Sequence, residues 1–228
     1  MKFFNSLIGD ICSITDHLEK KSFLPSDAWS DAGHNQVIMQ RDTAFELEGV
    51  GFNLVTNEKL NDEIVIVGND LGKIKSDTRF ARIAIIETDD VAGEQDAYKL
   101  IKKLEYVKYH CFPEGYMIRS TSRSHKESVR VSKAAVKNGI SFQSVGSLLI
   151  EKYKENPSVK NVKLIFITNP CADFEKTEKL ASKYREITEA LNHIMNNITF
   201  DCDTCNLKPI CDEVEGMKEL HFKNSGKM

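Results

Sequence analysis

Three short apolar runs constrain the fold of this chain more than any other feature of its sequence. Residues 64–67 and 82–86 are rich in isoleucine and valine, and residues 162–168 form the clearest run of this type. Turn residues such as Gly68 and Asn69 bound these runs, which is typical of strands buried on both faces of a sheet. Segments with helical periodicity separate the runs irregularly. We therefore predict an α/β fold with a mixed sheet flanked by helices.

The remaining elements follow from apolar periodicity and capping residues. Asn5 is a candidate cap, and Leu7, Ile11 and Ile14 recur at helical spacing, so we expect a helix from the start of the chain to about residue 22. Residues 23–43 are polar and irregular, as in a linker or an arm packed on the body. Further helices are predicted at 98–106, at 133–138 with Ser132 as a candidate cap, at 141–155 beginning with Ser141, and at 173–195. Further strands are predicted at 45–47, 51–55, 116–118 and 129–131.

The length of 228 residues suits one large domain with a small appendage. The predicted elements are not spread evenly, because the alternation of strands and helices begins only after the polar arm. We expect an N-terminal helix and linker over residues 1–40, an α/β domain over 41–198 and a short cysteine-containing metal module over 199–228. The segment 68–72 (GNDLG) resembles a phosphate loop but lacks its glycine spacing, and it is interpreted as a plain turn.

The overall charge excludes some classes of partner. The formal net charge is -3, and 41% hydrophobic with 29% charged residues is ordinary for a soluble globular protein. Such a chain is not drawn as a whole to nucleic acid or to a membrane. No stretch approaches the ~18 apolar residues of a membrane span, and Asp10 interrupts the apolar N-terminus before a signal-peptide core develops. We expect a cytoplasmic protein with reduced cysteines.

Three of the six cysteines form a C-x2-C-x5-C run near the end of the chain: Cys202, Cys205 and Cys211. Thiolates this close in sequence can converge on one metal centre with little loss of chain entropy. Residue types alone leave three interpretations open, namely an iron–sulfur cluster, a zinc site and unliganded thiols. The other cysteines, Cys12, Cys111 and Cys171, are isolated, and each is expected to be a small buried apolar residue.

Several segments together resemble a known family. In order along the chain they are DTAFEL at 42–47, IVIVGNDL at 64–71, EGYM at 114–117, VRVSKAAVKNG at 129–139, the strand ending at Thr168, a long helix and the C-x2-C pair. This ordered set is similar to the acetyl-CoA synthase subunit of the carbon monoxide dehydrogenase/acetyl-CoA synthase complex, over about residues 40–211. The family joins a methyl group, carbon monoxide and coenzyme A at a nickel–nickel–[4Fe-4S] cluster.

The resemblance implies that Cys202 and Cys205 are the first two cysteine ligands of a [4Fe-4S] cluster. Cys211 matches the third in order but not in spacing, and no cysteine follows it to match the fourth. The Cys-Gly-Cys element that holds nickel in the family is not present either. We therefore expect a cluster completed by a side chain of this protein, by another subunit or by a homodimer. Nickel is not expected, no catalytic residue is assigned, and acetyl-CoA synthesis by this chain alone is not expected.

The resemblance also gives a role to a basic segment between residues 119 and 137, which in the family belongs to the domain implicated in coenzyme A contact. Its six lysines and arginines are opposed within the segment only by Glu127. The expected phosphate-binding residues are Arg130, Lys133 and Arg123, with Arg130 the strongest candidate. A solvated basic surface is the competing interpretation. For the whole chain, the alternative to an iron–sulfur protein is a zinc-stapled or redox-sensing interaction subunit without enzymatic activity.

Overall fold

The computed structural model describes residues 4–89, 97–120, 125–195, 204–214 and 217. The described residues form a seven-stranded mixed sheet in the order β1-β3-β7-β4-β2-β6-β5, which confirms the predicted α/β fold class. Strands β2 and β4 are parallel, as are β3 and β7, and the other neighbours are antiparallel. The strands are β1 Lys20–Phe23, β2 Thr43–Thr56, β3 Glu63–Val67, β4 Thr78–Thr88, β5 Tyr116–Ser120, β6 Lys126–Ser132 and β7 Val159–Ile167.

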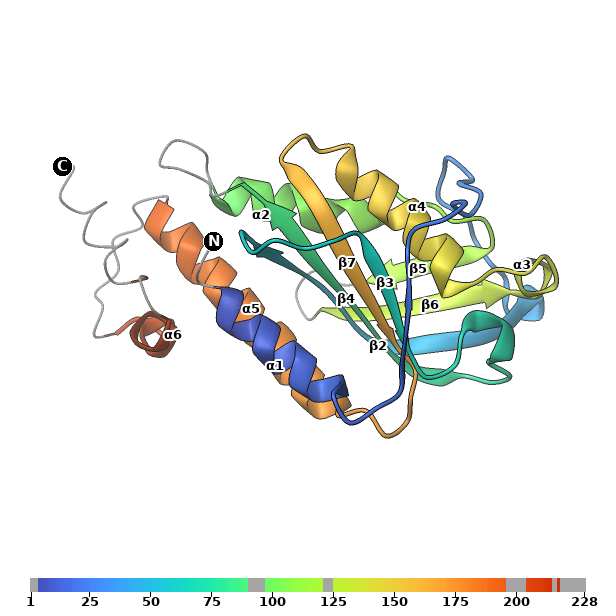
Figure 1. The fold of residues 1–228 in the computed structure, drawn as a ribbon, viewed down its shortest axis with the longest axis horizontal. Coiled ribbons are helices and arrows are strands. Elements are labelled where there is room, and N and C mark those ends of the chain that lie inside the picture. Colours follow the sequence, from blue (N-terminus) through green and yellow to red (C-terminus); the bar gives the residue numbers. More distant parts are fainter. Residues whose placement is uncertain (1–3, 90–96, 121–124, 196–203, 215–216, 218–228) are drawn as a thin grey trace.

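Helices α1 to α5 flank this sheet at the predicted places (Figure 1), whereas α6 was not predicted and packs on α5. They are α1 Asn5–Thr15, α2 Ala97–Tyr106, α3 Lys133–Lys137, α4 Phe142–Lys154, α5 Phe174–Met195 and α6 Lys208–Glu213, with 3-10 turns η2 Gln40–Asp42, η3 Leu71–Lys73 and η4 Val107–Tyr109. Ser132 caps α3 as predicted, and Ser141, predicted as the first residue of its helix, caps α4; each hydroxyl accepts a hydrogen bond from the backbone N–H three residues later. The predicted turn at 68–72 leads into η3.

Two predictions of secondary structure were wrong in extent. The N-terminal helix ends at Thr15, and Lys20–Phe23 instead form β1, because their backbone pairs with the edge of β3. Asn5 does not cap α1; its side chain accepts a hydrogen bond from the Thr56 hydroxyl. The predicted strands 45–47 and 51–55 are one 14-residue strand, β2. Gly49 lies within this strand, and only glycine fits there, because a Cβ would lie 1.8 Å from the carbonyl oxygen of Phe80 on β4.

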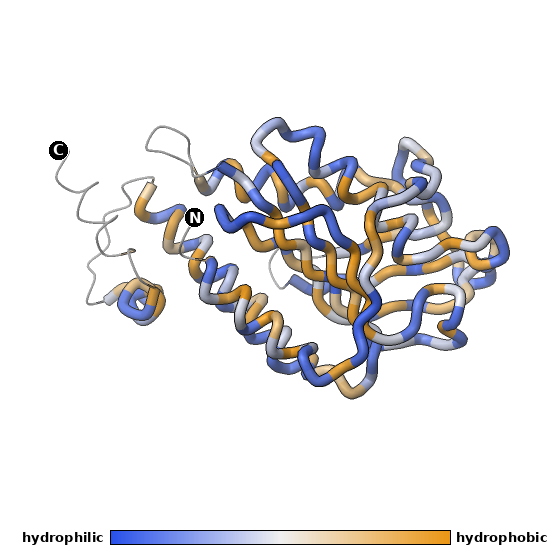
Figure 2. The backbone as a smooth tube through the Cα atoms, in the orientation of Figure 1, coloured by the Kyte–Doolittle hydropathy of each residue, from blue (hydrophilic) through white to orange (hydrophobic). Residues whose placement is uncertain are grey.

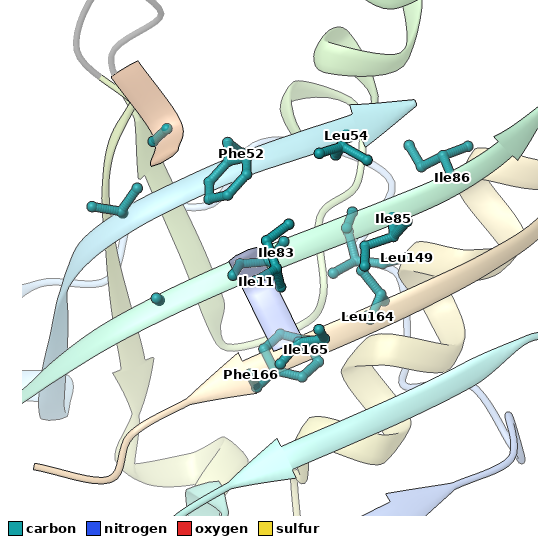
Figure 3. Close-up of a cluster of buried hydrophobic side chains, with 14 of the residues drawn as sticks. Ile11, Phe52, Leu54, Ile83, Ile85, Ile86, Leu149, Leu164, Ile165 and Phe166 are labelled. Atoms are coloured by element: carbon teal, nitrogen blue, oxygen red, sulfur yellow. The ribbon is translucent and has the colours of Figure 1, made fainter. Parts of the chain in front are cut away.

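Helices cover the two faces of the sheet differently. Helix α4 packs on β3 and β7, and α5, with α1 alongside it, packs on β2 and β4 (Figure 1). We call these sides the α4 face and the α5 face. The strands are the most apolar part of the chain (Figure 2), and buried side chains from the sheet, α1 and α4 meet around them (Figure 3). On the α4 face, the rings of Phe142 and Phe166 stack with centroids 4.5 Å apart.

The arm before β2 packs on the body, as predicted for residues 23–43. The backbone N–H of Trp29 donates to the carbonyl oxygen of Ser144 in α4, and its indole N–H donates to the carbonyl oxygen of Glu114. These bonds fasten the arm across α4 and the loop before β5. Within the described part of the chain, no helix is both long and apolar enough to span a bilayer.

Candidate functional site

A cleft of about 680 Å³ opens on the α5 face, between α5 and strands β2, β5 and β6. Helix α5 packs on β2 and β4, whereas β6 and β5 continue the sheet beyond β2. The outer part of this face is therefore not covered by α5. Alternate residues of neighbouring strands line the cleft together, since side chains on a sheet face recur at every second position.

Three cationic side chains from three strands line this cleft: Arg79 of β4, Arg119 of β5 and Lys126 of β6. All three are exposed. Arg119 has a long contact of 3.4 Å to a carboxylate oxygen of Glu46, and the guanidinium of Arg79 lies 4.8 Å from the ring centroid of Phe174. No carboxylate of the described residues lies within ion-pair distance of Arg79 or Lys126. The cleft therefore presents cations that an incoming anion can contact.

Acidic side chains and hydroxyls complete the lining. Glu48 and Glu178 line the cleft, together with Ser128 and Ser182; Ser120 also lines it, but its hydroxyl donates to the hydroxyl of Tyr109 at 3.1 Å. The two carboxylates limit the positive potential, so a ligand must place its anionic group near the cations rather than anywhere in the cleft. Hydroxyl groups can donate hydrogen bonds to phosphate oxygens without adding charge to the cleft.

Two of the three predicted phosphate-binding residues, Arg130 and Lys133, do not line this cleft. Arg130 is half-buried on β6, where its Nε donates to Glu46 at 2.8 Å and its Nη1 donates to the carbonyl oxygen of Ile38 at 3.2 Å. The ammonium of Lys133 donates to the carbonyl oxygen of Arg41 at 2.8 Å. Arg123 lies outside the described residues. Arg130 therefore ties β6 to the N-terminal arm and to β2, and Lys133 ties α3 to the arm; neither is one of the cleft cations.

Glu127 does not oppose the basic segment, which corrects the interpretation from sequence. Its side chain is buried and accepts two hydrogen bonds from Arg82, at 2.7 Å from Nε and 2.8 Å from Nη2. The Lys108 ammonium lies 3.7 Å from the same carboxylate. Burial alone would raise the pKa of Glu127, but the Arg82 guanidinium and the Lys108 ammonium lower it overall. The carboxylate that does meet the basic segment is Glu46.

This buried pair is tied into further hydrogen bonds beneath α4. Arg82 Nη1 donates to the side-chain oxygen of Asn53 at 3.3 Å, and the Tyr153 hydroxyl donates to the same oxygen at 2.9 Å. The Asn53 amide donates in turn to the carbonyl oxygen of Leu104 at 2.9 Å. A buried guanidinium satisfied in this way is a structural element rather than an open binding site.

The cysteine run is only partly within the described residues. Cys205 lies in the turn before α6 and Cys211 lies within α6; both thiols are half-buried. Cys202 lies outside the described residues. Helix α6 is anchored on α5 through apolar side chains such as Leu207 and Ile210. Among the residues that the structure describes, no three His, Cys, Asp or Glu side chains form a group that could hold a metal ion. The metal module therefore stays a prediction.

The isolated cysteines do not all follow the prediction. Cys111 is buried as expected, and burial raises the pKa of its thiol to about 12. Cys12 and Cys171 are exposed, so the prediction was wrong for these two. Cys12 lies on the side of α1 away from its buried residues Leu7 and Ile11.

Comparison with known proteins bears on the sheet rather than on the cysteines. Residues 29–172 match the model of one protein family, described as CO dehydrogenase/acetyl-CoA synthase complex beta subunit. The comparison with curated proteins finds no significant match. The matched residues include strands β2 to β7 and all three cleft cations, whereas the cysteine run lies beyond them.

Proposed function

The chain belongs to the CO dehydrogenase/acetyl-CoA synthase complex beta subunit family, and from this we propose that it handles coenzyme A in carbon monoxide and acetyl-CoA metabolism. The observation that carries the proposal is the cleft on the α5 face, where cations from three strands of the family-matched sheet converge. The family acts as a subunit of a complex, so a protein partner is part of the proposal.

The chemistry of coenzyme A suits this cleft. The molecule carries several phosphate groups, and phosphates are held in proteins by arginine and lysine side chains and by hydroxyl donors. Arg79, Arg119 and Lys126 supply the first kind of donor, and the serines of the cleft supply the second. No carboxylate of the described residues lies within ion-pair distance of Lys126 or Arg79, so phosphate binding at these two side chains breaks no ion pair.

Removing two of the cleft cations should weaken coenzyme A binding strongly. In the double variant Arg119→Gln/Lys126→Gln we expect the dissociation constant to rise by roughly tenfold for each lost charge, since a charge-assisted hydrogen bond contributes about 1.5–3 kcal/mol. Isothermal titration calorimetry with coenzyme A measures this directly. The wild-type affinity should also fall as salt rises, because the cations are exposed.

The matched control is Lys137→Gln. Lys137 belongs to the same basic segment and is exposed at the end of α3, but it does not line the cleft. Its replacement should leave the dissociation constant unchanged. Equal losses in the control and the double variant would indicate a diffuse charge effect, and wild-type protein without measurable affinity would refute coenzyme A binding.

We propose further that Cys202, Cys205 and Cys211 hold an iron–sulfur cluster of the [4Fe-4S] type. Thiolates are the usual ligands of such clusters, and the half-buried thiols of Cys205 and Cys211 can be reached from the surface. Three thiolates leave one iron for another ligand, which a partner subunit or a second copy can supply. Such a cluster, when bound, would supply one-electron chemistry. Zinc held by the same thiolates is the alternative, in a non-enzymatic interaction subunit.

A further inference from the structure

A second cavity of about 300 Å³ lies beside β2, next to the point where β6 begins. Its walls come from β2, from α2 and η4, and from His125, the residue before β6. The charged side chains in the lining are Lys102, Glu105 and Lys108. None of the three cleft cations contributes to this cavity.

The backbone conformation and the buried ring of His125 are both energetically unfavourable at this cavity. Its backbone φ is 50°, in the left-handed region that residues other than glycine seldom adopt. Its side chain is 8% exposed, and the ring nitrogen Nε2 has no hydrogen-bond partner among the residues that the structure describes. The carbonyl oxygen of His125 accepts from the N–H of Gly51, which fixes the residue to β2. A buried polar atom without a partner destabilises a fold, so this nitrogen is available for a ligand.

Lys108 presents a second incompletely bonded donor to the same cavity. The residue is 7% exposed, and its ion-pair partner Glu127 is 3.7 Å away, beyond direct hydrogen-bond distance. Burial, helped by the nearby Arg82, lowers the pKa of its ammonium although Glu127 opposes this effect. Burial removes water from the Lys108 ammonium, and an anion bound beside it would compensate for that lost hydration.

The charges around His125 select the sign of the ligand. Burial, together with the cations Lys108, Arg185 and Lys102, lowers the pKa of His125 to about 4 against the opposing effect of Glu127. The ring is therefore neutral at pH 7, and one of its tautomers carries a proton on Nε2. The three neighbouring cations make the surroundings unfavourable for a metal ion and favourable for an anion.

We propose that this cavity binds a small oxyanion, of the carboxylate or phosphate type, which accepts hydrogen bonds from Nε2 of His125 and from the ammonium of Lys108. Lys102, paired with Glu105 at 2.8 Å, adds positive charge at the cavity wall. The inference goes beyond coenzyme A binding and does not depend on it, because the two sites use different side chains. Both a free metabolite and a group on a larger molecule can provide such an oxyanion.

The test is a titration of the ¹⁵N-labelled protein with acetate and, separately, with inorganic phosphate, at constant ionic strength set by chloride. We expect saturable shifts of the His125 ring signals and of the Gly51 amide, and an upward shift of the His125 pKa when the anion is bound. The Gly51 amide reports on the site in variants that lack the imidazole. Saturation by acetate alone or by phosphate alone identifies which oxyanion is preferred.

Two variants and two controls separate the site from a general charge effect. His125→Asn keeps a residue that tolerates the left-handed backbone, and Lys102→Gln removes one wall charge; each should weaken binding by about tenfold. Lys103→Gln removes an exposed charge from the same helix away from the cavity, and Arg119→Gln/Lys126→Gln empties the cleft of two cations. Both should bind as the wild type does. Shifts that chloride reproduces, or unchanged binding in His125→Asn with an intact fold, would overturn the proposal.

Discussion

Replacement of Glu127 by alanine is expected to lower the free energy of unfolding by about 3–5 kcal/mol, because it leaves a buried guanidinium without its counter-ion. Arg82 is fully buried, and Glu127 takes both of its shortest hydrogen bonds. Only the longer bond to Asn53 would remain. Chemical denaturation followed by circular dichroism measures the change.

The matched control is Glu48→Ala, which removes an exposed carboxylate from the neighbouring strand and should change stability by less than about 0.5 kcal/mol. The double variant Arg82→Met/Glu127→Leu replaces both charges by apolar side chains. It should lower the free energy of unfolding by less than Glu127→Ala alone does. Similar stability of Glu127→Ala and Glu48→Ala would contradict the view that the pair is buried and essential.

Acid should weaken the same pair in a predictable pH range. Since Arg82 and Lys108 lower the pKa of Glu127 below its ordinary value, the pair contributes fully above the pKa of the unfolded carboxyl group. That contribution is lost as the pH falls through the lower, folded pKa. The unfolding free energy of Glu127→Ala should therefore fall less with acid than that of the wild type, when both are measured from about pH 7 downward.

Gly51→Ala should lower the free energy of unfolding by about 3 kcal/mol, because the new methyl group would collide with the carboxylate of Glu127. A Cβ on Gly51 would lie 2.0 Å from Oε2 of Glu127. That carboxylate cannot move aside without losing its bonds to Arg82. Thermal and denaturant unfolding of the purified variant measure the loss.

Gly9→Ala provides the control for the glycine substitution. Gly9 is exposed on α1 and a Cβ there has no neighbour within 4 Å, so alanine should stabilise the helix by up to about 1 kcal/mol. In a Glu127→Ala background the cost of Gly51→Ala should largely disappear, since the colliding group is gone. Full additivity of the two losses would show that the collision is not the cause.

The centre of the fold was predictable from local patterns. Strands β3, β4 and β7 lie side by side, and each is an apolar run buried on both faces, which a single sequence reveals without any knowledge of pairing. The edge strand β1 was not predictable, because Lys20 and Lys21 carry no strand signal and owe their conformation to the exposed edge of β3.

The candidate sites were predictable only in part, because they depend on the order of strands. The basic segment was recognised, and Arg119 and Lys126 from it line the cleft. Arg79 was missed because it joins them only through the β4-β2-β6-β5 order of the sheet. Arg82 offered one usable signal: an arginine inside an apolar run must be buried beside a carboxylate. Which carboxylate it would meet, Glu127, depends on tertiary structure.

Iron and acid-labile sulfide analysis of protein purified without oxygen tests most directly the claim that this family member is an iron–sulfur protein. We expect about four irons and four sulfides per chain, with absorption that bleaches on reduction. Cys202→Ala should lose the cluster, and Cys171→Ala, which removes an exposed thiol outside the run, should keep it. Stoichiometric zinc without iron, or a full cluster in Cys202→Ala, would contradict the claim.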